Sequence, residues 1–74
     1  MSRLAGFKYR EVARKLRILG FAFDRPGPRS HEVWRHQETG RKVTLPHHAR
    51  DLAAGTLRAA LREAGIDVEE YLKA

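Results

Sequence analysis

The chain has no cysteine, and its longest apolar run is the six residues from Ile18 to Phe23, one of which is glycine. The lack of cysteine excludes disulfide bonds and thiolate chemistry. A helix that crosses a bilayer needs about 20 consecutive apolar residues, so we expect no membrane-spanning segment and no membrane partner. The basic N-terminal residues are not followed by an apolar segment, which argues against a secretory signal. These absences predict a cytoplasmic protein.

Acidic residues are also scarce, with 9 Asp and Glu against 15 Lys and Arg and a formal net charge of +6 at pH 7. Residues 1–50 hold 12 Lys and Arg against 4 Asp and Glu, whereas residues 51–74 hold 3 against 5. Arginine outnumbers lysine 11 to 4, and its planar fork matches phosphate oxygens. The distribution indicates a polyanionic partner, although a merely soluble basic surface has the same composition.

The length of 74 residues predicts a single domain over residues 1–74. A chain this short buries only about 60–65% of its unfolded surface. Such a thin core leaves no room for an enclosed cofactor cavity, so we expect no cofactor. Any chemistry must then take place in a shallow groove on the surface.

Apolar residues at three- and four-residue spacing predict two helices. The first covers residues 7–19 and stops at Gly20, where a left-handed backbone costs glycine little. The second covers residues 55–64 and stops at Gly65. Asp67, followed three residues later by a glutamate, predicts a capping box and a last short turn.

Between the helices, alternating residues predict three short strands at 21–23, 30–36 and 41–45. Residues 24–28 are predicted to form a loop, because two prolines remove ladder donors and a glycine permits a turn. Residues 37–40 read as a hairpin turn. The order predicts an α+β fold, α-β-β-β-α, with a three-stranded antiparallel sheet and both helices on one face. Double-stranded RNA-binding domains have this order and size.

Side chains alternate between two faces along residues 30–36. Trp34, the only tryptophan, is predicted to anchor the core, so its face points toward the helices. His31 and Arg35 then point away from the helices. The same alternation in the third strand places two residues inward and two outward: Val43 and Leu45, and Lys42 and Thr44.

RNA can be cleaved without a metal ion. The ribose 2′-hydroxyl attacks the adjacent phosphorus when a base takes its proton, an acid protonates the departing 5′-oxygen and cations stabilise the charged phosphorane. Histidine acts as base or acid near neutral pH, and arginine or lysine supplies the cation. The outward face and its surroundings offer these groups: His31 as the catalytic candidate, and Arg29, Ser30, Arg35, Lys42 and His48 as RNA-binding candidates.

Plainer interpretations compete with this one. On pattern alone, an exposed strand histidine with no chemical role explains His31 more readily than a catalytic histidine does. His36 is interpreted as structural, and residues 47–48 either form a polar loop or bind substrate. Glu32 and Glu38 have no evident partner for acid–base work. A metal site is not expected, because the chain lacks a His-Glu-x-x-His pattern and cysteine, although a loose three-histidine site stays open.

Several short motifs occur in order along nearly the whole chain, from about Leu4 to Leu72: Leu19-Gly20-Phe21, Arg25, Ser30-His31, Trp34, Pro46-His47-His48, Asp51 to Arg58, and Ala64-Gly65-Ile66. In this order and spacing the chain resembles the HicA toxin family, the mRNA interferases of HicA–HicB toxin–antitoxin pairs. The resemblance implies the fold of double-stranded RNA-binding domains and ribosome-independent cleavage of messenger RNA with no known cofactor. It also implies a HicB antitoxin that covers the site.

The resemblance assigns one catalytic residue and meets one departure. The histidine of the family's Gly-Ser-His motif matches His31. Arg29 stands where the family has the glycine, which either adds a phosphate contact or narrows the groove. Two alternatives to a nuclease remain: a non-catalytic module that binds double-stranded RNA, and a structural partner subunit whose basic face serves an acidic protein.

Overall fold

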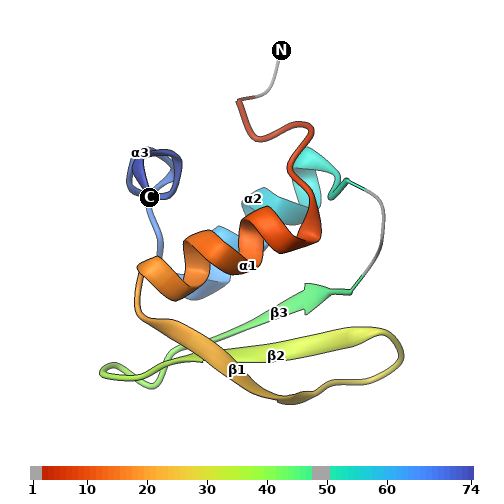
Figure 1. Cartoon of the computed structure of the whole chain (residues 1–74), viewed down its shortest axis with the longest axis vertical. Helices are drawn as coiled ribbons and strands as arrows, with labels where there is room; N and C mark the ends of the chain where they lie inside the picture. Colours follow the sequence, from red (N-terminus) through yellow and green to blue (C-terminus); the bar gives the residue numbers. More distant parts are fainter. Residues whose placement is uncertain (1–2, 48–50) are drawn as a thin grey trace.

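The structure is a computed structural model that describes residues 3–47 and 51–74. Six elements follow one another along the chain (Figure 1): α1 (Tyr9–Ile18), β1 (Phe21–Pro26), β2 (His31–His36), β3 (Lys42–Pro46), α2 (Ala54–Ala64) and α3 (Val68–Lys73). The predicted α+β fold is confirmed. The predicted last short turn is the six-residue helix α3.

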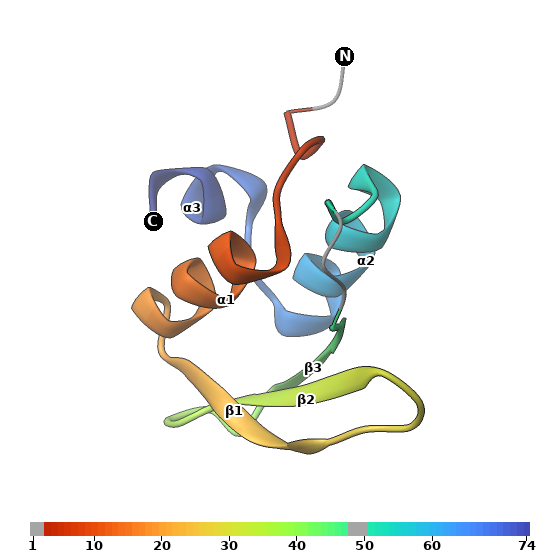
Figure 2. The same cartoon turned by 45° about the vertical axis from the view of Figure 1, so that its right-hand side comes forward.

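The sheet is antiparallel, with the strands in the order β1-β2-β3. The helices α1 and α2 lie on one side of the sheet, and α3 lies beside α1 on the far side of the helix layer (Figures 1 and 2). The turn between β1 and β2 projects beyond the helices at one end of the sheet. None of the described helices has the length and apolar character needed to cross a membrane.

The core lies between the helices and the inner face of the sheet. Trp34 is 1% exposed, which confirms its predicted inward position, and Val43 and Leu45 of β3 are buried beside it. Helix α1 buries the face predicted from its apolar spacing, including Val12 and Leu16. Because successive strand residues point to opposite faces, burial of Trp34 fixes the outward direction of its neighbours in β2.

The predicted helix ends are confirmed. Gly20 follows α1 with φ +96°, and Gly65 ends α2 with φ +74°, a left-handed conformation that glycine adopts without steric cost. Asp67 precedes α3, and instead of the bond with Glu70 that the predicted capping box requires, its side chain accepts a hydrogen bond from the backbone N–H of Glu69 at 3.1 Å. This bond satisfies one of the free donors at the start of the helix.

The predicted loop at residues 24–28 is wrong in its first half, because β1 continues to Pro26. β1 is an edge strand, and a proline is tolerated at the edge of a sheet, where no outer neighbour needs its N–H. The register with β2 shifts between Phe23 and Arg25, so one extra residue is accommodated as a bulge. The connecting turn is therefore shorter and tighter than the sequence indicated.

Candidate functional site

A tight turn of residues 28–31 joins β1 to β2. The backbone N–H of His31 donates to the carbonyl oxygen of Pro28 at 3.1 Å, and the N–H of Gly27 donates to the carbonyl oxygen of His31 at 2.9 Å. Arg29, the second residue of the turn, has φ +57° and is the only described non-glycine residue with positive φ. A positive φ at this position is the pattern of a type II′ turn, which suits a two-stranded hairpin and favours glycine there.

The same turn orients the His31 side chain. Its Nδ1 lies 3.2 Å from the carbonyl oxygen of Pro28. A carbonyl oxygen can only accept, so Nδ1 carries the hydrogen and donates it. In the neutral ring the lone pair is then on Nε2, which has no hydrogen-bond partner within the described part of the chain. Since His31 is partly exposed, the ring presents a basic nitrogen to solvent.

The strand register places three candidate residues on the outward face. His31 lies opposite Pro46, and Arg35 lies opposite Lys42. Arg35 and Lys42 are exposed, and neither forms an ion pair with any described residue. Arg35 lies four positions after His31 in the strand, a distance of about 13 Å at 3.3 Å per residue. Arg35 and Lys42 therefore lie too far from His31 to contact the same phosphate.

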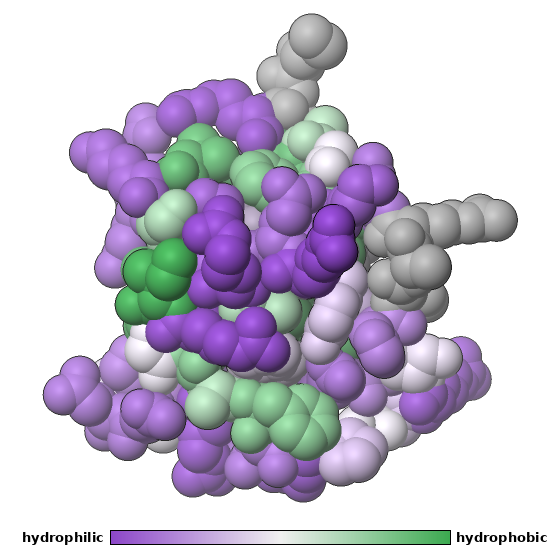
Figure 3. All heavy atoms as spheres, in the orientation of Figure 1, coloured by the Kyte–Doolittle hydropathy of each residue, from purple (hydrophilic) through white to green (hydrophobic). Residues whose placement is uncertain are grey.

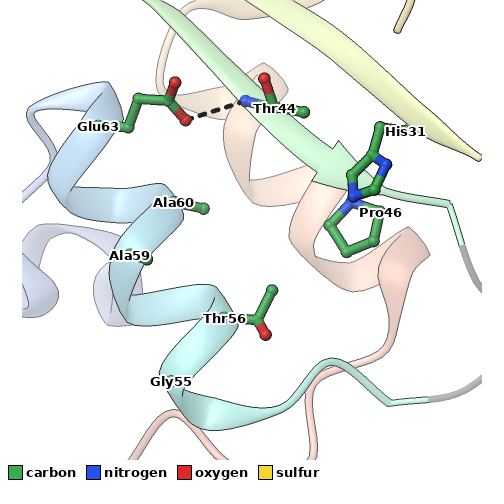
Figure 4. Close-up of a pocket in the computed structure, with 8 residues that line it drawn as sticks. All are labelled: His31, Thr44, Pro46, Gly55, Thr56, Ala59, Ala60 and Glu63. Atoms are coloured by element: carbon green, nitrogen blue, oxygen red, sulfur yellow. Dashed lines mark hydrogen bonds between the residues drawn. The ribbon is translucent and has the colours of Figure 1, made fainter. Parts of the chain in front are cut away.

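A groove borders His31 on the side of β3 and α2 (Figure 4). His31 and Pro46 form its wall on the sheet side, and Thr56 lies across from them on α2. Farther along, the Glu63 carboxylate accepts a hydrogen bond from the backbone N–H of Thr44 at 3.2 Å. This bond covers an exposed donor on the edge strand β3 and places a negative charge at that end of the groove.

A second, smaller hollow of about 210 Å³ lies at the β1–β2 turn, and we call it the hairpin hollow. It is lined by Phe23, Pro26, residues 29–32 and His47. It brings together the candidates Arg29, Ser30 and His31, with Arg29 exposed and in no ion pair among the described residues. Three of its other residues, Phe23, Pro26 and Glu32, come from the side of the sheet that carries Trp34.

Glu32, for which the sequence offers no evident partner for acid–base work, has hydrogen-bond partners in the structure. Tyr9 of α1 donates its hydroxyl hydrogen to Glu32 Oε1, and Trp34 Nε1 donates to the same oxygen at 3.4 Å. His47 Nδ1 lies 3.8 Å from Oε2. Burial, followed by the hydrogen bond to Glu32, raises the pKa of Tyr9 to about 12. The only signal in the sequence was that Glu32 shares the face of Trp34.

The remaining histidines have different positions. His36 Nδ1 accepts the backbone N–H groups of Glu38 and Thr39 at 3.1 and 3.2 Å, so this ring holds the β2–β3 turn together. His47 packs against the Tyr9 ring at a centroid distance of 4.6 Å. His48 lies outside the described residues. Among residues 3–47 and 51–74, no three His, Asp or Glu side chains gather in a way that could hold a metal ion.

The surface is largely hydrophilic on the face seen in Figure 3, and its apolar areas are small and separate. Two large apolar side chains are exposed among the described residues, Ile18 at 59% and Phe23 at 49%. Fold and site together define a class: a small basic α-β-β-β-α-α domain with an outward histidine at the tip of a hairpin.

Comparison with known families identifies the group within this class. The family model described as the HicA toxin of bacterial toxin–antitoxin systems matches residues 9–66, which extend from the first residue of α1 to just past α2. The chain belongs to the HicA toxin family, and membership gives it the role of the toxin in a toxin–antitoxin pair. No curated protein sequence matches the chain.

Proposed function

We propose that this toxin is an endoribonuclease that cleaves messenger RNA without a metal ion, with His31 as its catalytic residue. The observation that carries the proposal is the hydrogen bond from His31 Nδ1 to the carbonyl oxygen of Pro28, at 3.2 Å. This bond fixes the ring and leaves Nε2 as the basic nitrogen. Family membership supports the same function, as does the exposed Arg29 in the turn, which forms no ion pair with a described residue.

The reaction follows from the groups at the turn. Nε2 of His31 takes the proton of a ribose 2′-hydroxyl, and the 2′-oxygen attacks the adjacent phosphorus. The bond from phosphorus to the 5′-oxygen breaks, and that oxygen takes a proton from water at this open site. The imidazolium then returns its proton to solvent. The products are a 2′,3′-cyclic phosphate on one fragment and a 5′-hydroxyl on the other.

The cations have separate tasks in this proposal. Arg29 adjoins His31 in the turn, so its guanidinium is the group we assign to the phosphate under attack, where negative charge grows in the phosphorane. Arg35 and Lys42 lie opposite each other in β2 and β3, and they bind phosphates farther along the RNA. Ser30 adds a hydroxyl beside Arg29. His48 remains a candidate for RNA binding.

The same outward face is the proposed contact for a HicB-type antitoxin. An antitoxin that covers a cationic surface needs acidic or polar groups over it. Binding there would hide His31 and the pair Arg35–Lys42 together, because all three lie on one face of β2 and β3. Inhibition would then require no change in the toxin's conformation.

Purified protein incubated with a short RNA in excess chelator tests the proposal. We expect cleavage to persist, with cyclic-phosphate and 5′-hydroxyl ends identified by mass spectrometry. The same RNA with every 2′-hydroxyl methylated should remain whole, because the nucleophile is blocked. Cleavage that requires magnesium or zinc would overturn the metal-free mechanism. Intact RNA together with salt-sensitive binding would favour a non-catalytic RNA-binding module.

A further inference from the structure

The hairpin hollow contains an aromatic side chain that the fold does not need to expose. Phe23 is 49% exposed although it follows the buried Phe21 on the same face of β1. Its ring meets the Trp34 ring edge-on, at a centroid distance of 6.3 Å and an angle of 85°. The tryptophan is itself held by Arg17, whose guanidinium carbon lies 5.1 Å from the ring centre. Phe23 therefore packs against Trp34 on one side and is open to solvent on the other.

A carboxylate of fixed orientation lines the same hollow. Glu32 Oε1 is occupied by the hydrogen bonds from Tyr9 and Trp34. Oε2 has only His47 nearby, at 3.8 Å, which is longer than a hydrogen bond. The Glu32 side chain lines the hollow and is 20% exposed, and its Oε2 forms no hydrogen bond with a described residue. Among the described residues, nothing else uses this oxygen.

We propose that the hairpin hollow is a nucleobase-binding subsite that prefers bases with an exocyclic amino group over uracil. The inference rests on the proposed function, since it places the base of a nucleotide next to the bond that His31 cleaves. An exposed aromatic ring stacks on any base, and a carboxylate oxygen accepts from the amino group of cytosine, adenine or guanine. Uracil has no such group, and its ring donor N3–H lies between two carbonyl oxygens that repel a carboxylate.

The size and position of the hollow fit one base. Its volume of about 210 Å³ is below the ~300–1,000 Å³ of pockets for drug-sized ligands, so it takes a single ring system. His47 closes one side, and its backbone N–H donates to the carbonyl oxygen of Ser30 at 2.7 Å. Residues 29–31 also line the hollow, so a base seated there places its own ribose and phosphate at the turn.

Binding of 2′-O-methyl oligonucleotides, which the proposed reaction cannot cleave, tests the subsite. Fluorescence anisotropy with the full chain should show roughly tenfold tighter binding of oligocytidine or oligoadenosine than of oligouridine. Phe23→Ala should weaken binding of all three about 5- to 150-fold, and Phe23→Trp should retain it. Glu32→Gln should reduce the preference over uracil. Ile18→Ala removes the other exposed apolar side chain and should bind like the parent chain.

The outcomes separate the subsite from the catalytic proposal. If the parent chain cleaves RNA but Phe23→Ala and Glu32→Gln bind and discriminate as it does, the subsite is refuted and the nuclease stands. If the parent chain cleaves no RNA, but Phe23→Ala weakens binding and Glu32→Gln reduces the preference over uracil, the subsite stands without the nuclease. If Phe23→Ala leaves RNA binding unchanged and weakens only the complex with the antitoxin, the hollow is a protein interface and the subsite is refuted. Thermal melts confirm that each variant is folded.

Discussion

At the scale of single residues, the Tyr71 hydroxyl is buried without a hydrogen-bond partner among the described residues. Burial also raises the pKa of this hydroxyl above its ordinary value. The ring itself packs edge-on against Phe7 at 5.3 Å and lies under the Lys15 ammonium at 5.3 Å. Burying a hydroxyl without a partner costs about 1–3 kcal/mol, whereas the ring contacts are favourable.

Replacement of Tyr71 by phenylalanine should therefore stabilise the protein. The variant keeps the ring and loses the unsatisfied hydroxyl, so the free energy of unfolding should rise by about 1 kcal/mol. Urea denaturation of the two proteins measures the difference. A loss of stability in the variant would show that the hydroxyl has a favourable partner in solution.

Arg29 combines a backbone cost with a proposed contact to RNA. Its φ of +57° is left-handed, a conformation that costs most residues about 1–2 kcal/mol and that asparagine tolerates better. Arg29→Asn should raise the free energy of unfolding by up to about 1 kcal/mol and slow RNA cleavage, because the guanidinium is lost. Arg29→Lys keeps the charge and should retain more activity. Equal rates in both variants would remove Arg29 from the reaction.

The sequence predicted which way the side chains of β2 point, but it did not predict their hydrogen-bond partners. Alternation alone placed Trp34 inward and His31 outward, because one large apolar residue sets the phase of the whole strand. The partner of Glu32 was not predictable, since Tyr9 is 23 residues away and comes from another element. The orientation of His31 was also out of reach, because it depends on the backbone of the turn.

At the scale of elements, β1 shows why a composition rule failed. Proline and glycine at positions 26–28 indicated a loop. The rule behind this prediction applies to a central strand, where every backbone N–H pairs with a neighbouring strand and proline has none to offer. The sequence does not reveal which strand lies at the edge of the sheet. Once β1 is at the edge, Pro26 pairs with Glu32 and the bulge near Asp24 takes up the extra residue.

A hydrogen bond from Tyr9 of α1 to Glu32 of β2 links the two elements, and a titration of Tyr9 reports on this bond. Burial and the bond to Glu32 raise the pKa of Tyr9 to about 12. A pKa raised by folding adds stability below the ordinary value of about 10, and this stability is lost as the pH rises toward 12. Tyr9→Phe should therefore show a flatter decline of stability over this alkaline range.

Direct measurement is possible because the chain has two tyrosines. In a Tyr71→Phe background, ultraviolet absorbance should report the titration of Tyr9 alone, with a midpoint near 12. Adding Glu32→Gln should move the midpoint toward 10 without reaching it, because burial is the larger cause. A midpoint near 10 in the background protein would contradict the bond between α1 and β2.

Helix α3 explains a buried charge that the spacing of α1 did not indicate. Lys15 is 7% exposed, and its ammonium donates to the carbonyl oxygens of Ala74 at 2.8 Å and Leu72 at 3.4 Å. A cation at the C-terminal end of a helix is favourable, because the unpaired carbonyl groups carry partial negative charge. The contact could not be predicted, since residues 68–73 read only as a short turn.

At the scale of the whole molecule, positive charge lies mainly in α1, the sheet and its turn, whereas acidic residues are concentrated after residue 50. This division was visible in the sequence. The structure adds that Arg35 and Lys42 sit opposite each other on the outward face, where both are exposed. Arg58 and Arg62 are also exposed but belong to α2, so they provide a comparison pair.

The salt dependence of RNA binding should distinguish these two pairs. For a single strand, the slope of log affinity against log salt is about −0.7 for each phosphate neutralised. The double variant Arg35→Gln, Lys42→Gln should lose roughly 1.4 of that slope, whereas Arg58→Gln, Arg62→Gln should keep it. Equal slopes for both double variants would place the RNA on another surface.

The most direct test of the central claim is the single-turnover rate of RNA cleavage by His31→Gln, purified side by side with the parent chain and with Arg62→Gln. Glutamine keeps a polar side chain of similar reach beside Pro28 but cannot take a proton at neutral pH. Loss of an acid–base group costs about 10²–10⁴-fold in rate. We predict such a loss for His31→Gln, with an unchanged circular dichroism spectrum, and the parental rate for Arg62→Gln. Cleavage by His31→Gln at the parental rate would contradict the account.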